Sequence, residues 1–166
     1  KMYQPRDYRK SFSNELKWYN VCVEETDLMI GTDDNYSKQI LKIIRTLRHD
    51  IYAAIEKNQD FFTSLVPIEY KEAEGIAKIM TDAAKLAGVG PFAAVAGAIN
   101  DMLAQRLIDI SKQIFIENGG DIYIKSDKDR KIGIYAGNSV LSNKFAIEIQ
   151  KDLFPVGVCT SSATVG

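Results

Sequence analysis

The stretch AGVGPFAAVAGA, residues 87–98, places two glycines and a proline within four positions and then continues almost entirely with small residues. Gly88 suits the end of one helix and Gly90 the residue before the next. Pro91 suits the first helical position, because the missing proline N–H would have no partner there. The stretch therefore predicts two helices that meet at a sharp corner.

The corner also has a functional interpretation. The start of a helix presents unpaired N–H groups and the positive end of a dipole, which together suit a phosphate or a carboxylate. Gly88 and Gly90 are therefore candidate ligand-binding residues, beside the alternative of a plain helix–helix corner, which is the commoner use of such residues. Ala94 and Gly97 share a helix face, which we expect to be buried so tightly that Gly97→Leu destabilises the protein.

Hydrophobic periodicity outside the corner predicts a mixed fold. Alternating stretches favour strands, and apolar residues spaced three and four apart favour amphipathic helices. The expected strands are 18–24, 28–30, 113–124, 132–136 and 145–149, and the expected helices are 36–58, 71–87 and 91–111. We expect the strand at 132–136 to return as a hairpin partner of 113–124. Helices set between antiparallel hairpins predict an α+β fold with the helices on one face of the sheet.

The composition is that of an ordinary globular domain, with 166 residues, 46% hydrophobic, 26% charged and a net charge of −1. We expect a single domain over residues 1–166, with a leader at 1–17 and a native protein that continues beyond Gly166. The near-neutral charge predicts no nucleic-acid partner. The lack of a long apolar run or a signal peptide predicts a cytoplasmic protein with no membrane partner. Cys22 and Cys159 are in no metal-binding spacing.

The segment ENGGDIYI, residues 117–124, places two glycines inside an expected strand. Glycine weakens a strand, so either a simple bulge or a ligand lying against bare backbone should explain the pair, and we favour the two equally. The candidate binding residues of this segment are Asn118, Gly119, Gly120 and Asp121.

The same segment bears on metal binding. Glu117 and Asp121 are four residues apart, so in a continuous strand their side chains share a face about 13 Å apart. That separation is too large for one ion unless the glycines fold the strand between them. We therefore predict no metal site and no tightly bound divalent ion in this chain.

The final segment, CTSSATVG at residues 159–166, supplies hydroxyl donors. Thr160, Ser161 and Ser162 are candidate ligand-binding residues, although the segment alone is a weak signal. Cys159 is expected to be a small buried side chain rather than a nucleophile. His49, the single histidine, is expected to be an ordinary helical residue, and YAGNS at 135–139 an ordinary turn.

Taken together, the motifs resemble the ApbE-like superfamily and, more closely, an uncharacterised prokaryotic branch of it. The resemblance rests on ETDL at 25–28, FFTSLVP at 61–67, VGP at 89–91, ENGGDIY at 117–123 and the cysteine before TSS at 160–162. It covers nearly the whole chain, and several of the motifs are specific.

The resemblance implies a T-fold-like two-layer architecture, with an antiparallel sheet and paired helices on one face. ApbE proteins are magnesium-dependent transferases that move FMN from FAD to a serine or threonine of a target protein. In them, a GGD element similar to residues 119–121 borders the flavin site, and a Ser/Gly loop loosely matches 160–162. Their metal ligands come from a later region, beyond Gly166.

The sequence thus predicts a protein that binds FAD, FMN or another small phosphate-bearing ligand. Magnesium is expected only where the later region is present, and the catalytic residues stay unknown. If the protein is an enzyme, its activity resembles flavin transfer. The alternatives are a non-catalytic accessory protein of anaerobic cofactor or sulfur metabolism, and a structural domain that forms a homo-oligomer.

Overall fold

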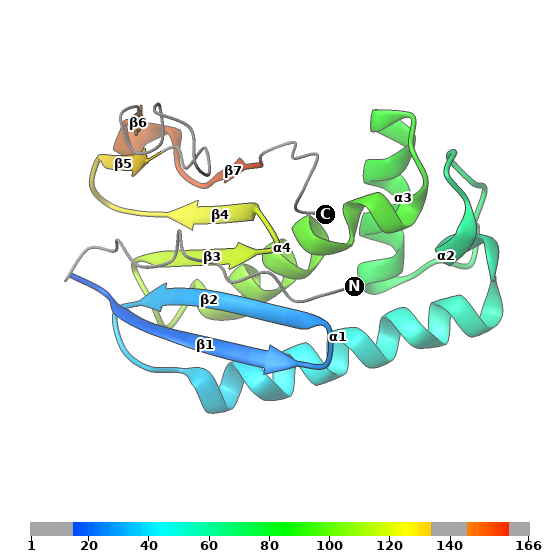
Figure 1. Cartoon of the computed structure of the whole chain (residues 1–166), viewed down its shortest axis with the longest axis horizontal. Coiled ribbons are helices and arrows are strands. Elements are labelled where there is room, and N and C mark those ends of the chain that lie inside the picture. The colour runs from blue at the N-terminus through cyan, green and yellow to red at the C-terminus, as the bar shows by residue number, and fades with distance from the viewer. Residues whose placement is uncertain (1–14, 134–145, 160–166) are drawn as a thin grey trace, which may run out of the picture.

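The computed structural model describes residues 15–133 and 146–159 and has an α+β fold, as the sequence predicts. Five antiparallel strands form one sheet in the order β1-β2-β3-β4-β7 (Figure 1). Their bounds are β1 Lys17–Val23, β2 Thr26–Thr32, β3 Ile114–Asn118, β4 Asp121–Lys125 and β7 Val156–Val158. The hairpin turns β1–β2 and β3–β4 lie at the same end of this sheet.

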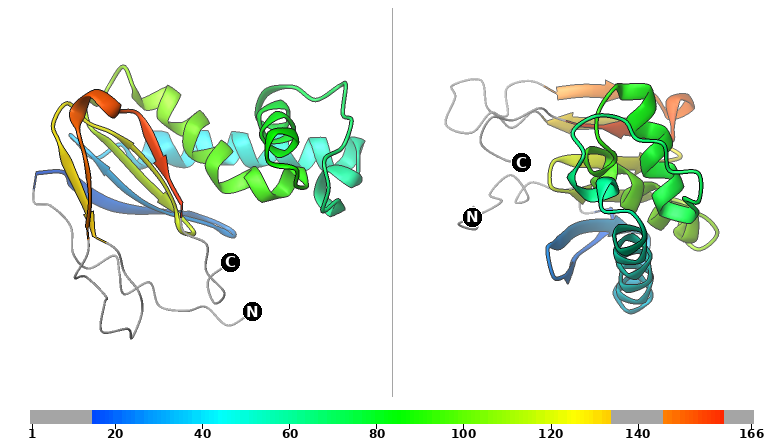
Figure 2. Two further views of the ribbon diagram at one scale, coloured as in Figure 1. Left: turned by 90° about the horizontal axis from the view of Figure 1, so that it is seen from above. Right: turned by 90° about the vertical axis from the view of Figure 1, so that its right-hand side faces the viewer.

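The long helices pack on one face of the sheet, as Figure 2 shows. Helix α1 contacts β1, and helix α4 contacts β3 and β4. Helices α2 and α3 lie beyond the end of the sheet that carries both hairpin turns. The bounds are α1 Ser37–Lys57, α2 Asp60–Thr63, α3 Gly75–Ala87, the 3-10 helix η2 Pro91–Ala94 and α4 Val95–Leu107. The predicted paired helices on one face are therefore confirmed.

The core follows the periodicities of the sequence. On β1, Tyr19, Val21 and Val23 face the helices, and on β2 Leu28 and Ile30 are fully buried. Helix α1 buries one residue every three or four positions, because that spacing keeps side chains on one face. Its buried residues are Ile40, Ile44, Leu47, Ile51 and Ala54.

The helix–helix corner forms as predicted. Gly88 ends α3 in the left-handed conformation with φ +72°, and Pro91 is the first residue of η2. The expectation of a tight face at Gly97 is wrong, because a Cβ there would have no atom within 4 Å. The buried residues of α4 begin at Ala98 and include Ile99 and Leu103, so the helix turns Gly97 away from this packed side.

The expected single strand over 113–124 is wrong. Gly119 and Gly120 form a two-residue hairpin turn between β3 and β4, with Asn118 paired to Asp121. Their φ values, +62° and +103°, explain why both are glycine, since a type I′ turn needs positive φ at both positions. The hairpin also puts Glu117 and Asp121 on opposite faces of the sheet, not on the same face.

Replacing either turn glycine tests this assignment. A φ of +103° is open to glycine only, so Gly120→Val should destabilise the protein by about 1–3 kcal/mol. Gly119→Asn should be far milder, because φ +62° is a conformation that asparagine tolerates. Chemical denaturation of both variants measures the difference, and equal losses would contradict the turn.

The expected pairing of the strand near 132–136 with 113–124 is also wrong. Strand β5, Arg130–Gly133, pairs with β6, Ala146–Ile149, in a separate two-stranded sheet. The place beside β4 is taken by β7 instead, where Ile124 pairs with Val156. Residues 135–139 lie outside the described residues.

Among the described helices, none alone has the length and apolar character needed to cross a bilayer. The pair Gly75–Ala87 and Pro91–Leu107 reaches that length and composition only when taken together, and it is bent by 107°.

Candidate functional site

A pocket of about 440 Å³ lies at the end of the sheet that carries both hairpin turns. The β1–β2 turn, the end of β3, helices α1 and α2, and the start of α4 surround it. Its walls combine apolar and aromatic side chains with a few polar groups, which is typical of small-molecule sites. The lining residues are Glu25, Thr26, Arg48, Ile51, Tyr52, Ile55, Gln59, Phe62, Phe92, Val95, Ala96, Ile99 and Asn118.

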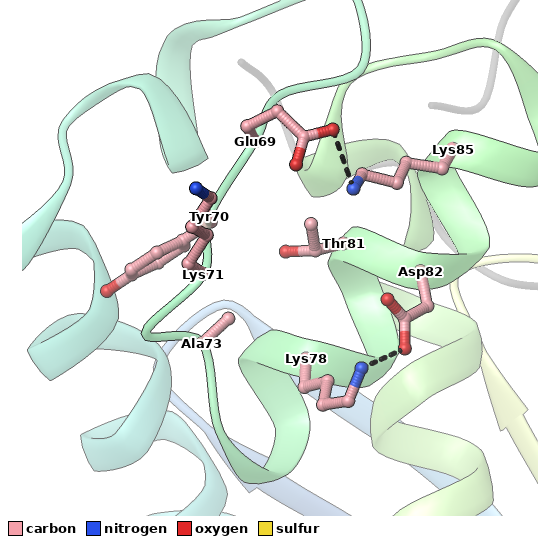
Figure 3. Close-up of a pocket in the computed structure, with 8 residues that line it drawn as sticks. All are labelled: Glu69, Tyr70, Lys71, Ala73, Lys78, Thr81, Asp82 and Lys85. Carbon is pink, nitrogen blue, oxygen red and sulfur yellow. Dashed lines mark hydrogen bonds and ion pairs between the residues drawn. The ribbon is translucent and has the colours of Figure 1, made fainter.

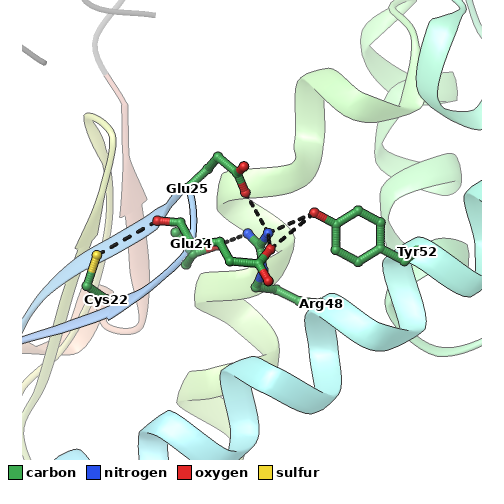
Figure 4. A network of polar contacts seen from close by, with 6 residues as sticks. Cys22, Glu24, Glu25, Arg48 and Tyr52 are labelled. Carbon is green, nitrogen blue, oxygen red and sulfur yellow. Dashed lines mark hydrogen bonds and ion pairs between the residues drawn. The ribbon is translucent and has the colours of Figure 1, made fainter. Parts of the chain in front are cut away.

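Arg48 lies at the centre of the hydrogen-bond network that forms the polar wall of the pocket (Figure 4). Its Nη1 donates to Thr26 Oγ1 at 2.8 Å, and its Nη2 donates to Glu25 Oε2 at 2.6 Å, to Tyr52 Oη at 2.9 Å and to the Glu24 carboxylate. Its Cζ atom also lies 5.5 Å from the centroid of the Tyr52 ring. The hydrogen bond from Arg48 lowers the pKa of Glu25 below its usual value.

Aromatic rings build a second wall of the pocket. Phe62 and Phe92 meet edge to face with ring centroids 4.7 Å apart. The fully buried Phe61 meets both Phe92 and Tyr70 edge to face, with ring centroids 6.2 Å and 5.8 Å apart. Edge-to-face pairs favour fixed ring positions, so this wall is a preformed surface for a flat apolar group.

The structure brings part of the predicted ENGGD site to this pocket. Asn118 lines it and donates from Nδ2 to the Ala96 carbonyl at 3.3 Å. Gly119 and Gly120 form the neighbouring turn, and the Gly120 N–H donates to Glu117 Oε1 at 3.0 Å. Asp121 lies opposite Asn118, and its backbone carbonyl accepts a hydrogen bond from the buried Asn100 at 3.0 Å.

The other predicted residues do not line the pocket within the described chain. Gly88 is exposed at the end of α3, and Gly90 is buried against the backbone of Ser64 and Leu65. The predicted residues Thr160, Ser161 and Ser162 lie outside the described residues.

Reasoning from the sequence missed Arg48, Tyr52, Phe62 and Phe92. One signal was present, since Arg48 and Tyr52 are four residues apart and so share a face of a predicted helix. Phe62 and Phe92 lie within FFTSLVP at 61–67 and within the stretch at 87–98, and neither local pattern marks them as pocket residues.

A second hollow, of about 270 Å³, lies between α3 and the loop that precedes it (Figure 3). It carries three lysines, but Lys85 pairs with Glu69 at 2.9 Å and Lys78 pairs with Asp82 at 2.7 Å. This hollow is also smaller, and Tyr70 is the one aromatic residue among those that line it, so the first pocket is the better candidate. Within residues 15–133 and 146–159, no three histidine, cysteine, aspartate or glutamate residues come together as a metal site.

Partial burial raises the pKa values of Asp101 and Asp121 above their ordinary 3.8. Burial, followed by the charge of Asp101, also raises the pKa of Tyr123. These carboxyl groups are therefore more easily protonated in the folded protein than in the unfolded chain.

The raised pKa of Asp121 predicts a pH-dependent effect of Asp121→Asn. The folded protein binds the proton of the Asp121 carboxyl group more tightly than the unfolded chain does, so protonation of Asp121 stabilises the fold. This stabilisation is complete below pH 3.8 and is lost as the pH rises through the raised pKa. The variant escapes that loss, so its melting temperature relative to wild type should increase as the pH rises above 3.8. A pH-independent difference, or an equal trend in the exposed-site control Asp50→Asn, would contradict this.

Comparison with known proteins gives a consistent family. A family model described as AbpE bacteria matches residues 9–166. The UPF0280 protein MJ1526 of Methanocaldococcus jannaschii is 40% identical over 155 residues, which cover 90% of this chain and 63% of that protein. A UPF0280 protein of Methanosphaera stadtmanae is 37% identical over 150 residues, covering 90% of this chain and 61% of that protein.

A third relative, the UPF0280 protein of Methanobrevibacter smithii, is 37% identical over 157 residues. That match covers 91% of this chain and 64% of the relative. The chain therefore spans less than two thirds of the length of these curated relatives.

Proposed function

The chain belongs to the family described as AbpE bacteria, and from that membership we propose that it binds a flavin nucleotide, or another phosphate-bearing ligand with a flat ring, in the pocket between α1 and α4. The observation that carries the proposal is the pairing of an aromatic wall with a wall built on Arg48. The ring system of a ligand would pack against the aromatic wall, and its anionic group would bind Arg48.

The two walls fit the two parts of such a ligand. Phe62 and Phe92 offer ring edges and faces to a flat apolar group, and Ile99 adds an aliphatic surface. Arginine matches a phosphate with two parallel N–H donors and keeps its charge at every physiological pH. Asn118 and Gln59 add polar groups that can orient the ring.

Flavin transfer by ApbE proteins uses magnesium, which prefers an octahedral set of oxygen ligands. The part of the chain that the structure describes brings together no such set of acidic side chains. A non-catalytic accessory role is compatible with the same pocket.

Titration of the protein with FMN, FAD and riboflavin, followed by flavin fluorescence, tests the proposal. We expect saturable binding of the nucleotides in the micromolar range or tighter, and weaker binding of riboflavin, which has no phosphate. Failure of all three to bind would remove flavins as ligands of this protein.

A second candidate, an oligomer-forming domain, is favoured by apolar side chains beyond the end of the sheet. Leu65 is 88% exposed, Val66 is 63% exposed and Leu86 is 93% exposed, so a second copy of the chain could bury them. Light scattering should give the mass of a dimer, and Leu86→Glu should return the mass to that of one chain. A monomeric wild-type protein would rule this candidate out.

A further inference from the structure

The guanidinium of Arg48 is fixed, whereas the carboxylates bound to it face solvent. The Arg48 side chain is 12% exposed, and those of Glu24 and Glu25 are 61% and 82% exposed. Thr26 and Tyr52 hold the guanidinium from the protein side. The glutamates can therefore leave Arg48 without opening the core, while Arg48 itself stays in the pocket wall.

The β1–β2 turn places Glu24 in a strained backbone conformation. Glu24 has φ +52°, the only positive value among the non-glycine residues that the structure describes. A non-glycine residue in that region is strained and persists only when its surroundings hold it. Here the Glu24 carboxylate bonds to Arg48 and accepts a further hydrogen bond from Tyr52 Oη at 3.3 Å.

Carboxylates and phosphates bind arginine through the same N–H donors, so they compete for one guanidinium. Building on the proposed function, we propose that Glu24 and Glu25 are internal anions that occupy Arg48, and that the phosphate group of the ligand takes Arg48 by displacing them. The β1–β2 turn then acts as a latch on the pocket, and Arg48 is the residue that selects phosphorylated ligands.

Removing the negative charges of Glu24 and Glu25 should strengthen the binding of ligands that carry a phosphate and leave the binding of other ligands unchanged. In Glu24→Gln/Glu25→Gln, the amides keep the shape of the side chains but bond to Arg48 without charge. Because charge-assisted hydrogen bonds are roughly twice as strong as neutral ones, we expect about tenfold tighter binding of a phosphate. Both residues are exposed, so the variant should fold normally.

Calorimetric titration with phenyl phosphate, FMN and riboflavin tests the latch. Phenyl phosphate and FMN should bind the double variant about tenfold more tightly than wild type, with riboflavin unchanged. Arg48→Lys, added to the double variant, should abolish that gain, because lysine lacks the paired donors. A control, Glu72→Gln/Asp109→Asn, makes the same change in net charge at exposed positions that do not line the pocket.

The outcomes separate the latch from the flavin assignment. A gain for phenyl phosphate with no flavin binding would leave the latch standing and remove flavin as the ligand. An equal gain for riboflavin, a gain of the same size in the control, or no gain for phenyl phosphate would overturn the latch. Flavin binding by the wild-type protein would still support the proposed function in those cases.

Discussion

Gly90→Ala should lower the melting temperature more than any other substitution considered for this chain. A Cβ at residue 90 would overlap the carbonyl oxygen of Ser64 and lie 2.7 Å from its carbonyl carbon and 3.1 Å from Leu65 Cα. These are backbone atoms, so the α3–η2 corner and the 64–65 loop would have to move apart. Overpacking of this kind costs about 3 kcal/mol, or roughly 6–12 °C in a domain of this size.

Gly97→Ala is the matched control, since it makes the same chemical change seven residues further on. A Cβ there would meet nothing within 4 Å, and alanine favours a helix interior over glycine by up to about 1 kcal/mol. The control should therefore be unchanged or slightly more stable. Similar melting temperatures for the two variants would contradict the packing of the corner against the 64–65 loop.

Ala96→Trp should abolish ligand binding while the protein stays folded. Ala96 is partly exposed on α4 and lines the pocket, so an indole at this position would fill the space between the aromatic and arginine walls. We expect at least about 100-fold weaker binding of FMN, equivalent to about 2.7 kcal/mol. Fluorescence titration measures the affinity, and circular dichroism confirms the fold.

Ala93→Trp is the control for that substitution. Ala93 is exposed on η2 and does not line the pocket, so the same indole should leave FMN affinity unchanged. If Ala96→Trp binds FMN as well as wild type does, the ligand lies elsewhere. If Ala93→Trp loses binding equally, the loss has no connection with the pocket.

Local patterns were enough to predict the elements of this fold. The spacing of the apolar residues from Ile40 to Ile51 marks α1, the alternation of Tyr19, Val21 and Val23 marks β1, and Gly88 with Pro91 marks the corner. Each of these signals depends on neighbours within a few residues, so each could be interpreted without the tertiary structure.

The pairing of the strands and the geometry of the pocket were harder to predict from the sequence, because both depend on residues that are distant from one another along the chain. The Gly119–Gly120 pair was expected inside one strand, as a bulge or beside a ligand, and the pairing of β3 with β4 shows that it is a hairpin turn. The pocket joins Arg48 of α1 to Phe92 of η2 and Asn118 of β3, and no local motif contains all three. The sequence could therefore place Asn118 near a site, whereas the spacing of Arg48 and Tyr52 indicates a shared helix face without linking it to that site.

NMR chemical-shift mapping of the labelled protein can show whether FMN binds in the pocket between α1 and α4. Bound FMN should change the chemical shifts of Phe62, Phe92 and Ile99, and of the side chain of Arg48. The lysines of the second hollow, such as Lys78, should keep their shifts. Changes confined to that hollow or to the sheet face opposite the helices, or the absence of any saturable change, would show that FMN does not occupy the pocket.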